Sequence, residues 1–158
     1  MALVKDFLNN KWETHCIGCS IGAKEMVPPG GLIRETRNFC LHQDPEIPIK
    51  AFLVITAQKH ISSISELSHE ESRELFDLVY ETRNVLKNID DITEITIVQE
   101  ERSSHFHLWL FPRYLWMKDY ENSLSNIRAI MSTAKNSRKD NVYINEILAA
   151  VEEIRSKL

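Results

Sequence analysis

Apolar positions along the chain follow two different periods, which predict strands and helices in turn. The continuous apolar run AFLVIT, 51–56, predicts a central, buried strand. The segment ITEITIVQE, 92–100, alternates and is rich in β-branched residues, and HFHLWLF, 105–111, also alternates. The polar EERSS between them predicts that they pair as antiparallel neighbours. Upstream, LIRETRNFCLH, 32–42, predicts two short strands around a polar turn.

Helical periodicity follows the central apolar run. Ser68 and Glu71 have the spacing of a capping box, and the apolar positions after them predict a helix over about 69–88. A shorter helix is expected over residues 5–13, ahead of the CIGC sequence. Strands on both sides of one strong helix are typical of an α+β fold with a mostly antiparallel sheet.

The end of the chain has a different character. Two amphipathic segments, 116–135 and 141–158, predict C-terminal helices, with Asp140 or Asn141 as the cap of the second. The 158 residues are expected to form a single domain over 1–158. Its core lies at about 14–115 and its helical extension at about 116–158.

Composition and charge exclude several function classes. The formal net charge is −4, so no basic field is present to attract nucleic acid, and none is expected as a partner. No apolar run approaches the roughly 20 residues that span a bilayer, so no membrane association is expected. The N-terminal sequence shows no signal peptide, and the C-x-x-C pair favours metal or redox chemistry over a secreted disulfide framework. The cytoplasm is the expected compartment.

Four residues have the chemistry of a zinc site. Cys16 and Cys19 have the spacing of a metal knuckle, His60 follows the central strand, and His105 opens the His-x-His strand. Two thiolates and two imidazoles complete tetrahedral coordination, which predicts a structural ion. The alternative is an idle C-x-x-C near unrelated histidines, and His15 is a rival ligand to His60.

A second group of candidate residues lies on one face of the 105–111 strand. Period-two spacing places His105, His107 and Trp109 on the same side. A neutral imidazole on a rigid strand can attack phosphorus, although hydrogen-bonded core histidines are the simpler alternative. His42, at a strand end, is a further residue able to line a pocket. The loop before the strand offers phosphate donors: Arg102, Ser103 and Ser104.

Taken in order, four segments resemble the histidine triad (HIT) superfamily, which includes dinucleoside polyphosphate hydrolases, nucleoside phosphoramidases and galactose-1-phosphate uridylyltransferase. The resemblance runs from about Cys16 to Arg113 and is specific through the order of its parts. The segments are CIGC (16–19), ETRNFCLHQDPEIPIKAFLVITAQKHI (35–61), SELSHEESRELFDL (65–78) and HFHLWLFPR (105–113).

The resemblance implies a fold and roles for individual residues. The fold is a small α+β domain in which one long helix packs on an antiparallel sheet of about five strands, commonly as a homodimer. His107 matches the nucleophile, and the chemistry needs no catalytic metal. His105 matches the histidine that completes a zinc site with the C-x-x-C pair and His60. The nucleoside-contacting stretch corresponds to Asn38, Phe39 and Leu41.

Two departures from the family pattern bear on activity. Trp109 stands where the third histidine is expected, and an indole N–H donates a hydrogen bond but cannot accept a proton. EERSS replaces the usual Gly-Gln-Ser, so Glu100 and Glu101 would oppose a polyphosphate unless they turn away or pair with Arg102.

The resemblance therefore implies a nucleotide hydrolase or transferase that cleaves a phosphate linkage, such as that of a dinucleoside polyphosphate, through a nucleotidyl group on His107. One alternative is a zinc-stabilised nucleotide-binding module with weak or no catalysis, marked by Trp109. Another is an interaction protein that uses its C-terminal helices to bind a partner, for which neither zinc nor nucleotide affinity is expected.

Overall fold

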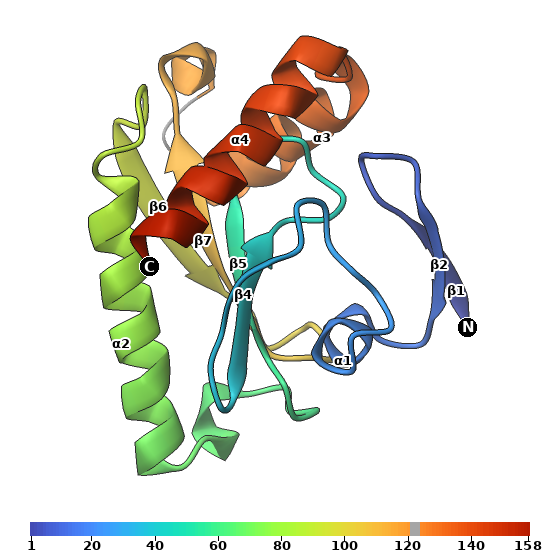
Figure 1. Ribbon diagram of the computed structural model, residues 1–158, viewed down its shortest axis with the longest axis vertical. Coiled ribbons are helices and arrows are strands. Elements are labelled where there is room, and N and C mark those ends of the chain that lie inside the picture. The colour runs from blue at the N-terminus through green and yellow to red at the C-terminus, as the bar shows by residue number, and fades with distance from the viewer. Residues whose placement is uncertain (121–123) are drawn as a thin grey trace.

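A five-stranded antiparallel sheet forms the centre of the computed structural model, which describes residues 1–120 and 124–158 (Figure 1). The strand order is β3-β4-β5-β7-β6. This confirms the predicted α+β class with its antiparallel sheet. The strands are β3 (Leu32–Glu35), β4 (Phe39–Gln43), β5 (Leu53–Ala57), β6 (Glu94–Gln99) and β7 (His107–Arg113).

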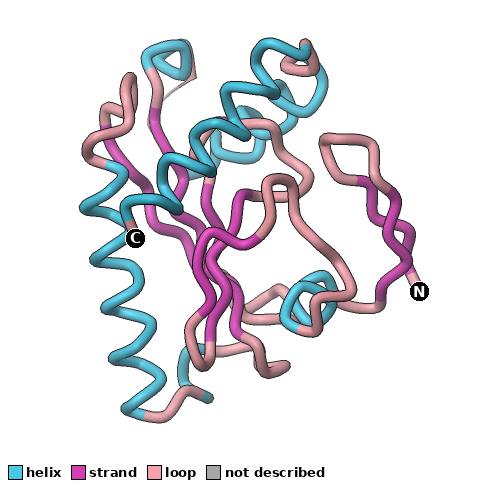
Figure 2. The backbone as a smooth tube through the Cα atoms, in the orientation of Figure 1, coloured by secondary structure: helices cyan, strands magenta, loops and turns pink. Residues whose placement is uncertain are grey.

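A separate two-stranded sheet stands at the edge of the molecule (Figure 2). Its strands, β1 (Ala2–Lys5) and β2 (Lys11–Thr14), pair as an antiparallel hairpin, so the helix predicted over 5–13 is wrong. The carboxylate of Asp6 accepts hydrogen bonds of 2.9 Å from two backbone N–H groups inside the turn. Asn9 has a φ of 70°, a conformation that turns the chain back and is incompatible with a helix.

One face of the sheet is covered by the long helix α2 (His69–Leu86), as Figure 1 shows. The predicted capping box is present, because the Ser68 hydroxyl accepts from Glu71 N and the Glu71 carboxylate accepts from Ser68 N. The helix buries the side chains at helical spacing that sequence periodicity marks. They are Leu75, Leu78, Thr82, Val85 and Leu86.

The other face of the sheet meets a short helix, α1 (Ile17–Gly22), and the hairpin lies beyond it (Figure 1). Residues on each strand alternate between the two faces. Leu41, Leu53 and Leu108 point into the core beneath α2. Their neighbours in the sequence, which include His42, Val54 and His107, therefore face α1 and the hairpin.

The C-terminal segment contains two helices, α3 (Ile127–Ser137) and α4 (Asn141–Lys157). The second is capped by Asp140, whose carboxylate accepts from Tyr143 N at 2.8 Å. The helix predicted over 116–135 is only partly confirmed. Its beginning is a 3-10 turn, residues 121–123 lie outside the described residues, and α-helix starts at Ile127. The 3-10 turns are η1 (Ile64–Glu66), η2 (Leu115–Asp119) and η3 (Leu124–Asn126).

Tyr114, which follows β7, and Tyr143 of α4 both bind the connection between β4 and β5. The Tyr114 hydroxyl donates to Lys50 O at 2.6 Å, and Lys50 N donates to the Tyr143 hydroxyl at 3.3 Å. Buried Phe52 and Phe111 pack into one hydrophobic cluster with side chains of α3. The extension is therefore packed onto the sheet through this cluster.

No helix in the described part of the chain is long and apolar enough to cross a membrane.

Candidate functional site

Two cysteines and two histidines from three parts of the chain meet at one end of the sheet. Cys16 and Cys19 lie at the start of α1, His60 follows β5, and His105 precedes β7. Their four ligand atoms all lie within 4.8 Å of one another. Figure 1 shows the loop before β7, in yellow, running beside α1. The structure thus brings together the four predicted zinc ligands.

The spacing of these atoms fits a tetrahedral ion. The distances from cysteine Sγ to histidine Nδ1 range from 3.2 to 3.7 Å, and the two Nδ1 atoms are 3.3 Å apart. Bonds of about 2.3 Å to sulfur and about 2.0 Å to nitrogen around a tetrahedral zinc give nitrogen–nitrogen and sulfur–nitrogen edges of about 3.3–3.6 Å. The observed distances match these edges.

The tautomer of His105 also fits a metal at this point. His105 Nε2 lies 2.7 Å from Ala57 O, and a carbonyl oxygen only accepts, so Nε2 carries the proton. The lone pair on Nδ1 then faces the two sulfurs. Burial lowers the pKa of His105, which favours this neutral form. Burial, followed by the contact with Cys16, raises the pKa of the Cys19 thiol, so a cation is needed to hold both thiolates. The cluster fits a structural zinc.

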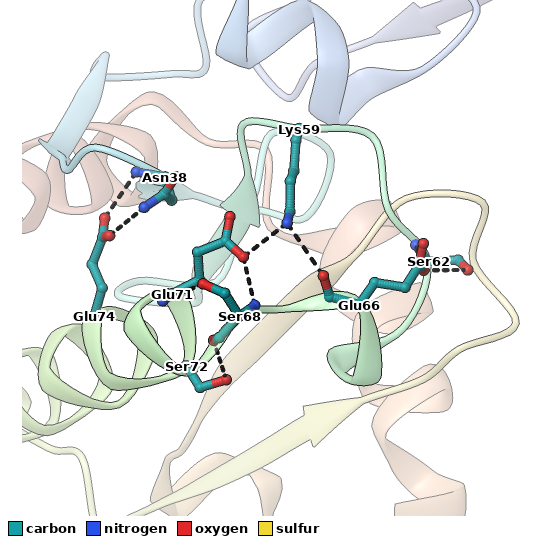
Figure 3. A network of polar contacts seen from close by, with 8 residues as sticks. All are labelled: Asn38, Lys59, Ser62, Glu66, Ser68, Glu71, Ser72 and Glu74. Atoms are coloured by element: carbon teal, nitrogen blue, oxygen red, sulfur yellow. Dashed lines mark hydrogen bonds and ion pairs between the residues drawn. The ribbon is translucent and has the colours of Figure 1, made fainter.

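The loop that carries His60 is braced by a polar network (Figure 3). Lys59 Nζ donates to the Glu71 carboxylate at 2.8 Å and to Glu66 O at 3.2 Å. Glu66 in turn accepts from Ser62 N at 2.8 Å. These bonds tie Lys59 to the start of α2 and to η1, and Ser62 to η1, so the imidazole is held in place from outside the cluster.

A cavity of about 420 Å³ opens beside this cluster, on the sheet face opposite α2. Its floor consists of two rows of cross-strand partners. In one row Thr56 of β5 lies opposite His107 of β7, and in the next Val54 lies between His42 and Trp109. Residues directly opposite in antiparallel strands share a face, so these side chains line one surface. The hairpin contributes to the wall.

His107 presents one ring nitrogen to this cavity. Its Nδ1 lies 3.1 Å from His105 O, and because the carbonyl only accepts, Nδ1 carries the proton of the neutral ring. The lone pair is then on Nε2, at the far end of a ring that lines the cavity. The carbonyl that orients His107 belongs to a zinc-ligand candidate, so the cluster and His107 form one unit.

His42, which the sequence marks as a residue able to line a pocket, lines the same cavity. Its Nδ1 donates to Gln43 O at 2.8 Å, which leaves the lone pair on Nε2. Burial lowers the pKa of His42 to about 4, so the ring is neutral at pH 7. Nε2 has no hydrogen-bond partner among the described residues, and the side chain lines the cavity. The available signal was a polar residue at the end of a buried strand.

Trp109 forms the part of the cavity floor next to His107. Its ring packs edge-on against Phe52 with centroids 5.6 Å apart, and the His107 ring lies at the same centroid distance, tilted by 40°. The indole is therefore anchored in the hydrophobic cluster beneath α3, while part of it faces the cavity.

The predicted phosphate-binding residues lie in different environments. Ser103 and Ser104 line the cavity, whereas Arg102 is exposed and does not line it. The Ser103 hydroxyl lies 3.1 Å from Glu100 O and 3.0 Å from His105 O. Its proton is therefore directed to main-chain carbonyls, and Ser104 is the serine of this loop whose hydroxyl has no hydrogen-bond partner among the described residues.

The two acidic residues of this loop pair with other partners than Arg102. Glu100 forms an ion pair of 3.0 Å with Arg128 of α3. The Ser63 hydroxyl donates to the Glu101 carboxylate at 2.6 Å. Both carboxylates thus hold the loop to neighbouring segments.

The predicted nucleoside-binding residues do not line this cavity. Phe39 and Leu41 have 0% exposure and lie in the core beneath α2. Asn38 is bound to Glu74 through its backbone N–H at 2.8 Å and its side chain at 2.5 Å (Figure 3). His15, the rival ligand, lines the cavity and is not part of the zinc cluster.

Comparisons with known proteins bear on the fold. No family model matches the sequence, and no curated protein matches it. Among solved structures, a Zn-bound histidine triad family protein from Mycobacterium smegmatis is similar, with a TM-score of 0.60 and 14% identity over 90% of this chain and 96% of that one.

Two further solved structures agree with this likeness. A Hit-like protein involved in cell-cycle regulation from Bartonella henselae has a TM-score of 0.60 and 14% identity, over 93% of this chain and 99% of that one. A histidine triad nucleotide-binding protein from Candida albicans has a TM-score of 0.53 and 19% identity, over 63% of this chain and 75% of that one. The chain therefore has the fold of the histidine triad proteins.

Proposed function

We propose that this protein is a histidine triad-type nucleotide hydrolase or nucleotidyltransferase in which His107 is the nucleophile. One observation carries the proposal. The bond from His107 Nδ1 to His105 O, 3.1 Å long, directs the Nε2 lone pair of the neutral ring toward a cavity of about 420 Å³. A nucleophile held on a strand beside a cavity of ligand size is typical of covalent catalysis.

The reaction proceeds in two balanced steps. The Nε2 lone pair of His107 forms a bond to the α-phosphorus as the bond from phosphorus to the leaving group breaks, and that group departs with the electron pair. Water, or another acceptor, then attacks the same phosphorus. The N–P bond breaks, its electron pair returns to Nε2, and the proton of the attacking water passes to solvent. The product of hydrolysis is a nucleoside monophosphate.

The cavity floor offers a place for the nucleoside. His42 lies one row from His107 along the sheet and two strands away across it, because β5 separates β4 from β7, which corresponds to a Cα separation of about 11–12 Å. The side chains of both residues line the same cavity, so a ligand attached to His107 can extend toward His42. A ligand hydroxyl that donates a hydrogen bond to the unpartnered His42 Nε2 would satisfy this buried acceptor. Trp109, in the same row, provides an aromatic surface for the ligand.

Charge on the phosphoryl group is stabilised from the loop before β7. Ser104 lines the cavity, and the exposed Arg102 extends from the same loop. A guanidinium and a hydroxyl at this edge complement a developing negative charge. We assign Ser103 the task of shaping the loop through its bonds to two carbonyl groups.

The zinc cluster has a supporting role in this proposal. Cys16, Cys19, His60 and His105 would hold the ion, which cross-links α1 to the loops before α2 and β7. Because His105 O orients His107, fixing His105 also fixes the nucleophile. The Zn-bound state of the Mycobacterium smegmatis protein supports this assignment.

A second candidate function rests on Trp109. An indole cannot transfer a proton to a leaving group, so a nucleotide-binding module with weak or no turnover is the alternative. The nucleotide-binding protein of the same fold from Candida albicans is consistent with either function.

The deciding experiment is a screen of nucleotides with the purified chain. We expect turnover of a dinucleoside polyphosphate or a nucleoside phosphoramidate, and a nucleotidyl adduct on His107 seen by mass spectrometry. His107→Ala should abolish both while the protein remains folded. Nucleotide-dependent thermal stabilisation without turnover or adduct would favour the binding module, and undiminished turnover by a folded His107→Ala protein would rule out this nucleophile.

The proposal includes a homodimer in the cytoplasm. Phe76 and Tyr80, 76% and 67% exposed, lie one turn apart on α2, and Ile97 of the edge strand β6 is 50% exposed. Such apolar side chains support an interface with a second copy. Sedimentation of the parent chain and of Phe76→Glu tests this interface. We expect the parent to be a dimer and the variant a monomer. Reduced thiolates at the zinc cluster fit the cytoplasm.

A further inference from the structure

The cavity floor contains a buried hydroxyl with no hydrogen-bond partner. Thr56 of β5 is 5% exposed, and its Oγ1 has no partner among the described residues. Of the buried side-chain polar atoms without partners in that part of the chain, only Thr56 Oγ1 and His42 Nε2 belong to residues lining the cavity. Buried polar groups are almost always hydrogen-bonded, so an unpartnered one in a cavity floor points to a ligand atom.

The position of Thr56 relates it to the proposed nucleophile. Thr56 and His107 are direct partners in the antiparallel pair of β5 and β7, so both side chains leave the same face. The Cβ atoms of such partners lie about 4.5–5.5 Å apart. A phosphoryl group bound to His107 Nε2 therefore lies over the cavity floor from which the Thr56 side chain projects.

Apart from Ser104, which lines the cavity from the loop before β7, few other donors are free at this point. The Ser103 hydroxyl is directed to two carbonyl oxygens, and Arg102 is exposed outside the cavity lining. His42 Nε2 is an acceptor, because its ring proton is on Nδ1. A phosphoryl group that gains negative charge during transfer needs donors directed at its oxygens. The Thr56 hydroxyl has a proton to give and no competing acceptor in the described residues.

We propose that Thr56 is a catalytic residue, whose hydroxyl donates a hydrogen bond to a non-bridging oxygen of the phosphoryl group transferred to His107. This inference rests on the proposed function and extends it to a residue outside the histidine-containing strand. Thr56 keeps its proton throughout. The N–P bond forms and the bond to the leaving group breaks as described above, and the hydroxyl stabilises the charge on the phosphoryl oxygens in both steps.

If the Thr56 hydroxyl had a purely structural role, its removal in Thr56→Val would destabilise the ligand-free protein. A structural hydroxyl would have a partner in the protein, and its removal would leave that partner unsatisfied. Thr56 Oγ1 has none, so Thr56→Val replaces an unpartnered hydroxyl with a methyl group of similar size. The ligand-free variant should be as stable as the parent or more stable.

The chain offers a matched control. Thr82 of α2 is also buried, with 0% exposure, and its hydroxyl is likewise unpartnered among the described residues. It packs in the core on the other side of the sheet, away from the cavity. Thr82→Val makes the same chemical change without touching the proposed site.

The test compares Thr56→Val, Thr56→Ser, Thr82→Val and His107→Ala in the full chain. The probes are adenosine 5′-phosphoramidate and di(adenosine-5′) tetraphosphate, and the readouts are kcat, KM and the ligand-free Tm. We expect Thr56→Val to lower kcat about 10- to 100-fold with KM changed less than about threefold and Tm not reduced. Thr56→Ser should keep most of the activity, and Thr82→Val all of it.

Each other outcome overturns the inference. If Thr56→Val keeps kcat within about threefold while His107→Ala abolishes turnover, the proposed function stands and the role of Thr56 is wrong. A lower Tm in Thr56→Val, with KM raised as strongly as kcat falls, would show a structural residue. If the parent chain turns over neither probe, the proposed function fails for these substrates, and the role of Thr56 fails with it.

Discussion

Gly18 lies directly against the ring of His105. A Cβ atom at position 18 would be 2.3 Å from His105 Cδ2 and 2.5 Å from its Nε2, the atom that donates to Ala57 O. Neither distance is sterically possible, so a side chain at position 18 must displace the imidazole. The glycine between the two cysteines is therefore required by the packing of α1 against a zinc-ligand candidate.

Gly18→Ala is expected to displace His105, lower the zinc content and reduce Tm by about 5 °C or more. Gly22→Ala, in the same helix, is the control, because its Cβ would lie 3.5 Å from Gln58 Cα, an ordinary contact. Alanine also favours helix over glycine. Metal analysis and thermal denaturation of both variants measure the effect, and equal zinc content in the two would contradict it.

Removal of zinc is expected to destabilise the whole protein. A structural ion contributes its binding free energy to folding, so a strong chelator should lower Tm by about 10 °C or more, reversibly on adding zinc. Cys19→Ser should remove the response to chelator. Cys40→Ala provides the matched control, because this buried thiol lies outside the four-ligand cluster. A Tm of the parent that does not depend on chelator would refute the structural role.

Trp109→His tests the missing proton donor. An imidazole can give a proton to a poor leaving group, which an indole cannot do. The variant is therefore expected to increase kcat about tenfold for a phosphoramidate, whose amine leaves poorly without a proton. A dinucleoside polyphosphate, whose phosphate leaves readily, should show little change. Trp109→Phe keeps an aromatic ring and should give no gain with either substrate; an equal gain in both variants would disprove the proton argument.

Asp44 gives the protein a defined pH dependence. Burial raises the pKa of this carboxyl to about 7, although its Oδ1 accepts from the N–H groups of Ile47 and Glu46 at 2.8 and 2.9 Å. The folded state therefore binds the proton more tightly than the unfolded state, in which the pKa of the carboxyl has its usual value of 3.8. Stability from Asp44 is complete below about pH 4 and is lost as the pH rises through about 7.

Asp44→Asn keeps an acceptor oxygen for the same two N–H groups and does not titrate. We expect the difference in Tm between variant and parent to be small near pH 4 and to favour the variant by several degrees near pH 8. Thermal denaturation across this range is the measurement. A variant that is less stable than the parent at both ends would show that the carboxylate itself is needed.

The sequence predicted the elements that have strong local signals. The α2 helix has its capping box at Ser68 and Glu71 and a clear apolar stripe, so both its start and its buried face were correct. The residues 5–13 lacked such a cap. Their conformation depends on the Asp6 carboxylate within a turn and on pairing between β1 and β2, which short-range periodicity does not indicate.

The candidate site was predictable in its metal ligands and less so in its cavity. Donor chemistry left His15 as a rival to His60, and the resemblance to the HIT superfamily selected Cys16, Cys19, His60 and His105, which the structure brings together. Which residues line the cavity depends on the face of the sheet to which each strand residue points. Because β4 alternates between faces, His42 lines the cavity while Phe39 and Leu41 enter the core, and only the register of the sheet settles this.

The hydrogen bonds of Tyr114 and Tyr143 to Lys50 have a consequence for the cooperativity of unfolding. The β4–β5 connection, the cluster around Phe52 and the indole of Trp109 all depend on the last third of the chain for their packing. A break in α3 or α4 would therefore loosen the part of the cavity floor formed by Trp109, although neither helix contains His107. Hydrogen exchange in the C-terminal helices and on the cavity floor should therefore report one shared opening event.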